Sequence, residues 1–373
     1  MPQLLLSAVR HARAALLLYA GIRALGLAAL FLWAHLADRD ALVLLSGRWD
    51  SLWYVRVVEH GYDFTLTAPD GRVLSDLAFF PLLPWLEEGV SALTPLSPGH
   101  AGVVISALAG LAAAWGIFLL VTEVAGERTA LFTVGLWAAL PVGIVQSMAY
   151  SEALFTALAA WALYATVRGS WPLAGALAAL AGLTRPVGMA VAAAVWAGAY
   201  LALRHGTGRR APVLWGAALA PLGAAGYVLW VGHRTGNLIT GYLDVQGAWG
   251  NGFDGGLAFG RFIADLLLGP AFPAGLALLA GVVLLGRLYW AGVRQGQPPP
   301  LLVYTGIVLL LALCSSAYFG SKPRLLMPAF PLLIPLAAAL ARTTAARARA
   351  VLAGMAAGAA VYGAFWLHGS GPP

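Results

Sequence analysis

The stretch ALLLYAGIRALGLAALFLWAHL, residues 15–36, decides the fold class of this chain. It is apolar apart from Arg23 and His35, and its ~22 residues reach the length of about 20 that a membrane-spanning helix requires. The apolar core of a secretory signal peptide has only about 7 to 15 residues. We therefore predict that residues 15–36 form a first transmembrane helix.

Apolar runs of this kind recur along the whole chain of 373 residues, which is 61% hydrophobic and only 10% charged. Soluble domains carry more charge, about a quarter of their residues. The pattern predicts an all-α polytopic membrane protein in which residues 1–373 form a single transmembrane domain. The roughly eleven transmembrane helices that follow from the length rule are 15–36, 101–122, 130–148, 151–167, 172–187, 188–203, 211–231, 271–286, 300–317, 325–341 and 350–367.

The distribution of charge orients this bundle. The segments predicted on the same side of the membrane as the N-terminus hold twelve arginines and two acids. The segments predicted on the other side hold nine basic residues and thirteen acids. Positive residues concentrate in cytoplasmic loops, so the N-terminus is predicted to be cytoplasmic. Lys322 is the only lysine, and a chain rich in alanine, glycine and arginine is typical of GC-rich genomes, so we expect a bacterial plasma membrane. Cys314 is the only cysteine, which excludes an internal disulfide and a zinc cluster.

Two segments on the predicted outer side are too long to be turns, residues 37–100 and 232–270. The first combines aromatic residues with prolines, as in LAFFPLLPWLEE (77–88), which favours short helices in the membrane interface. We expect it to carry the active site, with Glu87 and Glu88 as solvated charges at a helix end. The second is rich in glycine and is a candidate for a mobile lid.

The densest polar cluster is GRWDSLWYVRVVEHGYDF, residues 47–64. On a helix, Asp50 shares a face with Tyr54, and Glu59 and His60 follow toward the far end. No cation lies beside Asp50 at helical spacing. Two interpretations stay open: an interfacial helix with aromatic anchors and solvated charges, or a site in which Asp50 is the general base for a substrate hydroxyl.

Further ionisable residues are predicted at the outer ends of helices: Glu152 in AYSEALF, Arg185 in LTRPVG, and Lys322 and Arg324 in GSKPRLLMPAFP. Charges at membrane depth are costly and tend to mark functional sites, although snorkelling at a helix end is the alternative. The three cations together suit a phosphate, because arginine presents a planar fork of donors. The predicted site therefore has Asp50 as catalytic base and the substrate-binding residues Trp49, Tyr54, Glu59, His60, Asp76, Glu152, Arg185, Lys322 and Arg324.

Several classes of chemistry lack their motifs in this sequence. There is no GxxxxGK[ST], GxGxxG, HExxH or CxxC pattern, which argues against nucleotide hydrolysis, dinucleotide chemistry and zinc peptidase chemistry. A lipid-linked glycan transporter remains an alternative, because helix interruptions at Pro141 and Pro186 suit a midplane site. A non-catalytic subunit of a glycan assembly machine is the second alternative.

The ordered motifs RWDSLWYVRVVEHGY, LAFFPLLP, YSEALF and LTRPVG resemble the family of the mannosyltransferase that adds the second mannose of GPI anchors, with its bacterial relatives, in the glycosyltransferase C superfamily. The resemblance implies a membrane enzyme that transfers mannose from a polyprenyl or dolichyl phosphate carrier to an acceptor on the extracytoplasmic side, with inversion at the sugar carbon. It assigns to Asp50 the essential acid of the first outer loop.

The same resemblance sets the expected partners. The donor is a lipid-phosphate sugar, so we expect no nucleotide sugar, no bound metal and no other cofactor. The eukaryotic members have Ser-Asn-Gly where this chain has Pro186, Val187 and Gly188. Because bacteria ordinarily lack GPI anchors, the expected acceptor is another glycolipid, a glycan or a protein.

Overall fold

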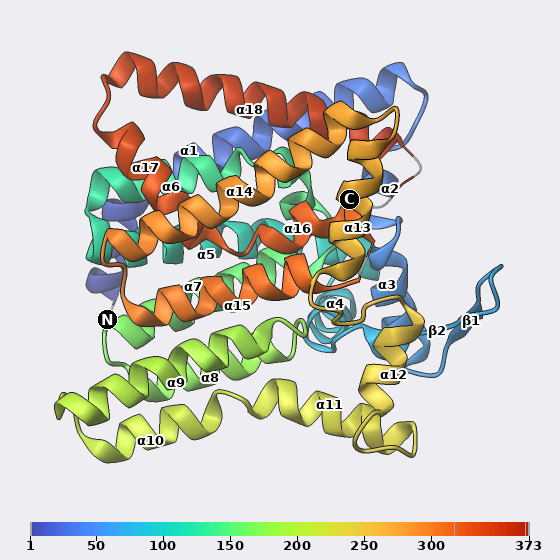
Figure 1. The fold of residues 1–373 in the computed structure, drawn as a ribbon, viewed down its shortest axis with the longest axis horizontal. Coiled ribbons are helices and arrows are strands. Elements are labelled where there is room, and N and C mark those ends of the chain that lie inside the picture. Colours follow the sequence, from blue (N-terminus) through green and yellow to red (C-terminus); the bar gives the residue numbers. More distant parts are fainter. Residues whose placement is uncertain (1, 317, 370, 372–373) are drawn as a thin grey trace.

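The computed structural model describes residues 2–316, 318–369 and 371, with side chains from Ala12 onward. Long helices lie side by side across the molecule, and short elements gather at one end of the bundle, on the right in Figure 1. The helices of the bundle are α1 (Pro2–Leu36), α5 (Pro98–Ala125), α6 (Glu127–Ala138), α7 (Ser151–Val167), α8 (Trp171–Gly182), α9 (Gly188–His205), α10 (Arg210–Leu219), α11 (Leu222–Arg234), α14 (Phe272–Arg294), α15 (Pro299–Cys314), α17 (Ile334–Ala341) and α18 (Ala345–His368).

The remaining elements are shorter. They are α2 (Ala41–Ser46), α3 (Asp50–His60), β1 (Thr65–Thr67), β2 (Val73–Ser75), η1 (Asp76–Ala78), α4 (Leu82–Leu93), η2 (Pro141–Ser147), α12 (Gly241–Ala248), α13 (Leu257–Leu268), η3 (Phe319–Ser321), α16 (Lys322–Leu326) and η4 (Phe330–Leu333). The strands β1 and β2 pair antiparallel, with Leu66 opposite Leu74. The first outer segment thus holds the expected short helices and also a hairpin that was not expected.

The prediction of an all-α membrane bundle is confirmed, because each predicted apolar run overlaps helical structure; residue 317 of the run 300–317 lies outside the described residues. Among the described residues, five helices are long and apolar enough to cross a membrane when α10 and α11 are counted as one, and two bent pairs raise this to as many as seven. Three further apolar helices, α7, α8 and α15, are shorter. The predicted span 172–187 is too long, since α8 ends at Gly182, before Pro186. The residue preceding a proline disfavours helical geometry, which explains the early end.

A break at Pro141 bends the predicted span 130–148, because α6 and η2 meet at 85°. Proline has no N–H group, and a broken helix leaves carbonyl groups without partners. Arg23 of α1 fills this need: its guanidinium donates to the carbonyl oxygens of Ala138, at 2.7 Å, and of Gly143. The buried arginine inside the first predicted span therefore satisfies carbonyls on both sides of the break.

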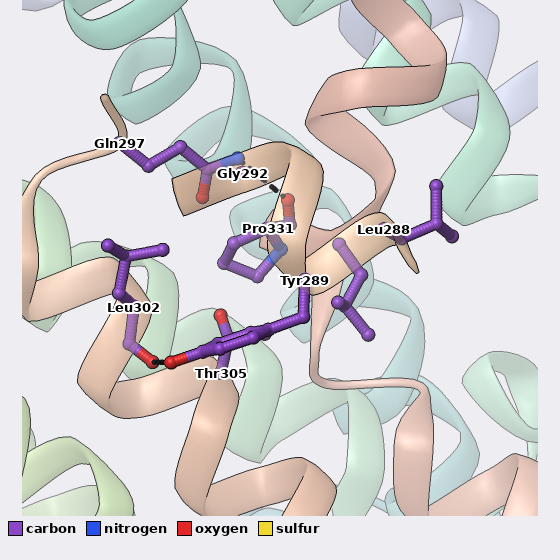
Figure 2. A pocket seen from close by; sticks show the side chains of 8 residues that line it. Leu288, Tyr289, Gly292, Gln297, Leu302, Thr305 and Pro331 are labelled. Carbon is purple, nitrogen blue, oxygen red and sulfur yellow. Dashed lines mark hydrogen bonds between the residues drawn. The ribbon is translucent and has the colours of Figure 1, made fainter. Parts of the chain in front are cut away.

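The hairpin between α14 and α15 is closed at the end of the bundle that lies opposite the short elements. Figure 2 shows Tyr289 donating to the carbonyl of Leu302 and Gln297 donating to the carbonyl of Pro331, each at 3.3 Å. Side chains fill the space between them so fully that it has no volume for a water molecule. The bond from Gln297 fixes η4 against the turn between α14 and α15.

Candidate active site

Asp50 is the first residue of α3, and the chain enters this helix through a strained residue. Trp49 has φ 51° and ψ −118°, a conformation that side-chain-bearing residues rarely adopt and that costs on the order of 1–3 kcal/mol. The guanidinium of Arg48 lies 3.9 Å from the centre of the Trp49 ring and donates to the carbonyls of Leu367 and Gly369 at the end of α18. The C-terminal helix therefore holds the segment that aims Asp50.

Four charged side chains meet at this point. Asp50 Oδ2 lies 2.5 Å from Arg324 Nη1, and Arg324 Nε lies 3.5 Å from Glu152 Oε1. The same Glu152 oxygen forms an ion pair with Arg185 Nη1. Glu152 is 1% exposed, the two arginines 9% and 12%, and Asp50 25%. The charges alternate in sign and balance, and Asp50 is the member most open to a substrate.

The expectation that Asp50 has no cation partner therefore holds only along its own helix. Arg324 comes from α16, 274 residues later in the chain. The structure brings Asp50, Glu152, Arg185 and Arg324 together from four separate segments. Two of the three expected cations thus lie at one place.

Hydroxyl groups connect the charges to α3. Tyr54 shares a hydrogen bond of 2.9 Å with Ser151 Oγ, which also accepts from Arg185 Nη1 at 3.2 Å. The Tyr150 hydroxyl accepts from the backbone N–H of Asp50 at 3.3 Å, and its ring lies 5.2 Å from the Arg324 guanidinium carbon. Burial raises the pKa of Tyr54 well above its ordinary value, so its hydroxyl stays protonated.

The site leaves free groups of both signs. Within the described part of the chain, Asp50 Oδ1 accepts no hydrogen bond, and Arg185 and Arg324 each keep N–H groups without an acceptor. A free carboxylate oxygen can take a proton from a hydroxyl. Free guanidinium donors can bind phosphate oxygens. The arrangement can therefore serve transfer from a phosphate-linked donor to a hydroxyl acceptor.

Lys322 makes its contacts elsewhere. Its ammonium donates to the carbonyls of Ala312 and Ser315, at 2.8 and 2.9 Å, and lies 4.6 Å from the centre of the Phe259 ring. Lys322 and Arg324 are two positions apart on α16 and so point to different sides of the helix. The third cation expected at the phosphate instead binds the end of α15.

The other expected residues of the first outer loop lie away from the ion-pair cluster. Glu59 and His60 are exposed at the end of α3, 3.9 Å from one another. Asp76 is buried and accepts from the Phe64 N–H at 3.0 Å, which fixes the start of the hairpin. Burial raises the pKa of Asp76, while the Phe64 N–H and the Ser75 hydroxyl act in the opposite direction.

Glu87 is a correction to the sequence analysis. It was expected to be solvated at a helix end, but it is 0% exposed, and neither of its carboxyl oxygens has a hydrogen-bond partner among the described residues. It packs against Gly102 of α5, where a side chain at position 102 would collide with its carboxyl group. Burial raises the pKa of Glu87 well above its usual range.

The second outer segment rests on the first. Trp249 Nε1 donates to the Ser75 carbonyl at 3.0 Å, and its ring meets the Trp53 ring edge-on at 4.8 Å. Gln246 donates to the Ala78 carbonyl at 3.1 Å. Residues 232–270 thus form α12 and α13 rather than an unstructured loop, and their role as a lid stays a prediction.

Three residues of the site were missed in the choice of candidates: Arg48, Tyr150 and Ser151. Tyr150 and Ser151 lie within the motif YSEALF that carried the resemblance. That motif was therefore the available signal for both. For Arg48, the signal was its place directly before the Trp-Asp pair.

Together, the bundle and the site define a multi-pass membrane protein with a fold of the glycosyltransferase C type. The structure is similar to that of ArnT from Cupriavidus metallidurans bound to undecaprenyl phosphate, with a TM-score of 0.55 and 18% sequence identity over 88% of this chain and 61% of that one. The same protein in the apo state gives a TM-score of 0.54, also at 18% identity, over 86% and 61%. The chain thus spans about three fifths of the length of ArnT.

A narrower likeness comes from the sequence. Residues 79–230 match the family model of the dolichyl-phosphate-mannose-protein mannosyltransferases. The matched region contains Glu152 and Arg185, while Asp50 and Arg324 lie outside it. No curated protein sequence matches the chain.

Proposed function

We propose that this protein is a membrane mannosyltransferase of the glycosyltransferase C type. It moves mannose from a polyprenyl phosphate carrier to an acceptor hydroxyl, with inversion at the sugar carbon. The observation that carries this proposal is the ion-pair cluster itself. Asp50 offers a free carboxylate oxygen, and Arg185 and Arg324 offer free N–H groups beside it.

The proposed reaction needs one base and one anion site. Asp50 Oδ1 takes the proton of the acceptor hydroxyl as its oxygen attacks the anomeric carbon. The bond from that carbon to the phosphate oxygen breaks, and polyprenyl phosphate leaves with the electron pair. Arg185 and Arg324 stabilise the charge that develops on the phosphate. Attack from the face opposite the leaving group inverts the configuration.

Two likenesses support the choice of donor. The matched family is described by dolichyl phosphate mannose, and the similar ArnT structure holds undecaprenyl phosphate, so both concern lipid phosphates. The resemblance of the sequence motifs to the GPI mannosyltransferase family supports mannose as the sugar. The acceptor in this proposal is a glycolipid, a glycan or a protein, and the proposed reaction uses no metal.

We place the reaction outside the cytoplasm, on the strength of the arginine distribution. The end of the bundle that carries Asp50 and the hairpin holds most of the acids, and the start of α10 lies at the other end (Figure 1). In a bacterial plasma membrane, this puts Asp50 on the outer side. Single cysteines at Asp70 and Arg209 should label from opposite sides, and labelling from the same side would overturn this orientation.

The variant Asp50→Asn distinguishes the proposed enzyme function from the two alternatives, a transporter and a non-catalytic subunit. The amide keeps the size of the side chain but cannot take the proton, so turnover should fall by about 10²- to 10⁴-fold while donor binding is kept. Asp50→Glu should also be poor, because it displaces the carboxylate. Asp70→Asn is the matched control, since Asp70 is exposed in the same outer segment, where it pairs with Arg72.

The assay uses purified protein, radiolabelled polyprenyl phosphate mannose and a membrane extract as acceptor source. A transporter or an assembly subunit would form no product in this assay. Alternatively, its own activity would be unchanged in Asp50→Asn. If Asp50→Asn folds, binds donor and keeps more than about a tenth of wild-type turnover, Asp50 is not the base.

A further inference from the structure

A second concave surface lies at the end of the bundle opposite Asp50. It is a groove of about 460 Å³ lined by Pro172 at the start of α8 and by Arg209, Ala211, Pro212, Trp215 and Leu219. In Figure 1, α10 lies at the far side of the molecule from α3. The groove therefore shares no residue with the proposed active site.

The groove is apolar along its length and basic at one end. Pro212, Trp215 and Leu219 follow one another at intervals of three and four positions, so they form one stripe of α10. Beside this stripe, α10 is fixed to α8, because Gly216 packs directly on Trp171 and Gly175. The stripe is thus left open, and Trp215 is 66% exposed.

The basic end has no anionic partner in the described part of the chain. Arg204, Arg209 and Arg210 are exposed, and none of them forms a hydrogen bond or an ion pair through its side chain. The sequence has no acid between Glu152 and Asp244, the whole stretch from which α8, α9 and α10 are built. On the same side, Glu123 already pairs with Arg168 at 3.2 Å. An external anion would complete this charge pattern.

We propose that the groove binds an anionic phospholipid, with the headgroup phosphate at Arg209, which lines the groove, and an acyl chain along α10. Arg210 follows directly in the chain and adds positive charge next to the groove without lining it. From Arg209 to Leu219 the helix rises about 15 Å, which is the depth of one leaflet of a hydrocarbon core about 30 Å thick. Basic pockets between helices on the cytoplasmic side are suited to such headgroups. On the orientation proposed above, the lipid belongs to the inner leaflet.

Native mass spectrometry of the full-length protein in detergent tests this, with phosphatidylglycerol and phosphatidylcholine of the same acyl chains as probes. Wild type should bind phosphatidylglycerol more tightly. The double variant Arg209→Gln/Arg210→Gln should lose on the order of 25-fold of that preference, about fivefold for each arginine. The pair Arg347→Gln/Arg349→Gln, exposed at the start of α18, is the matched control and should keep it.

A second readout locates the acyl chain. Phosphatidylglycerol with brominated chains quenches nearby tryptophans, and the difference between wild type and Trp215→Phe should report this one ring. No preference for phosphatidylglycerol, an equal loss in the control pair, or no quenching assigned to Trp215 would overturn the proposal. Displacement of the lipid by inorganic phosphate at equal concentration would also overturn it, because the site would then hold a free anion.

Discussion

Glu152→Gln tests the ion-pair cluster most directly. The carboxylate of Glu152 is 1% exposed and lies between two arginines, one of them 3.5 Å away. At an effective dielectric constant of about 20, that longer contact alone amounts to about 5 kcal/mol of Coulomb attraction. Removing one partner of a buried pair typically costs about 3–5 kcal/mol, because the other charge stays buried and uncompensated. We expect the unliganded variant to lose about that much stability.

The same variant should respond more strongly to polyprenyl phosphate. Arg185 and Arg324 would then lack their shared carboxylate, and a phosphate would replace the missing negative charge. If about 1.4 kcal/mol of the lost energy is returned on binding, affinity for polyprenyl phosphate rises tenfold. Thermal unfolding with and without the lipid phosphate measures both effects.

A control separates charge from general damage. Glu123→Gln removes one partner of an exposed pair, with Arg168 at 3.2 Å, and should change stability by less than about 1 kcal/mol with no change in lipid phosphate binding. The opposite outcome is that Glu152→Gln loses stability but binds polyprenyl phosphate no better, or less well, than wild type. The two arginines would then have no part in holding the phosphate.

Three further predictions concern the fold around the site. Trp49→Gly should be more stable than Trp49→Ala by about 1 kcal/mol in denaturant titration, the reverse of the usual order, because φ is 51°. Burial raises the pKa of Glu87 above its unfolded value of about 4.3, so wild type loses stability as pH rises from that value through the folded pKa. Glu87→Met should therefore be more stable than wild type at neutral pH by on the order of 1–3 kcal/mol, and this difference should narrow toward pH 4, while the exposed control Glu88→Met shows no such trend. Arg23→Met should unfold more easily by about 2–4 kcal/mol, because two carbonyls at the helix break lose a charged donor, and unchanged thermal stability would contradict that role.

The helices could be predicted from the sequence because a bilayer requires long apolar runs with internal hydrogen bonds. The run 15–36, for example, lies entirely within α1. The proline indicated an interruption at Pro141, but hydropathy says nothing about the size of a bend, so the angle of 85° could not be predicted. The hairpin did have a signal, since Pro69, Asp70 and Gly71 form a typical turn between β1 and β2.

Less of the site could be predicted from the sequence, because its residues meet only in the folded bundle. Spacing along a helix identifies neighbours within three or four positions, which is enough to place Asp50 and Tyr54 on one face of α3. Arg324 reaches Asp50 only through the packing of the whole bundle. Glu87 was misjudged for the same reason, because its burial depends on the close approach of α5 at Gly102.

The alternation of charge suggests how donor binding and base catalysis are coupled, a hypothesis that rests on one side chain. Arg324 binds one oxygen of Asp50 at 2.5 Å, and the proposed phosphate site uses the same guanidinium. A phosphate that draws Arg324 toward itself would release Asp50 Oδ2, so the acceptor hydroxyl would meet a carboxylate with both oxygens free only when the donor is bound. In the unliganded enzyme, Asp50 would then be less available as a base for a water molecule. Competition of this kind means that Asp50→Asn should bind donor at least as tightly as wild type, because Arg324 loses a rival carboxylate. Weaker donor binding by Asp50→Asn would instead show that Asp50 holds Arg324 in place for the phosphate.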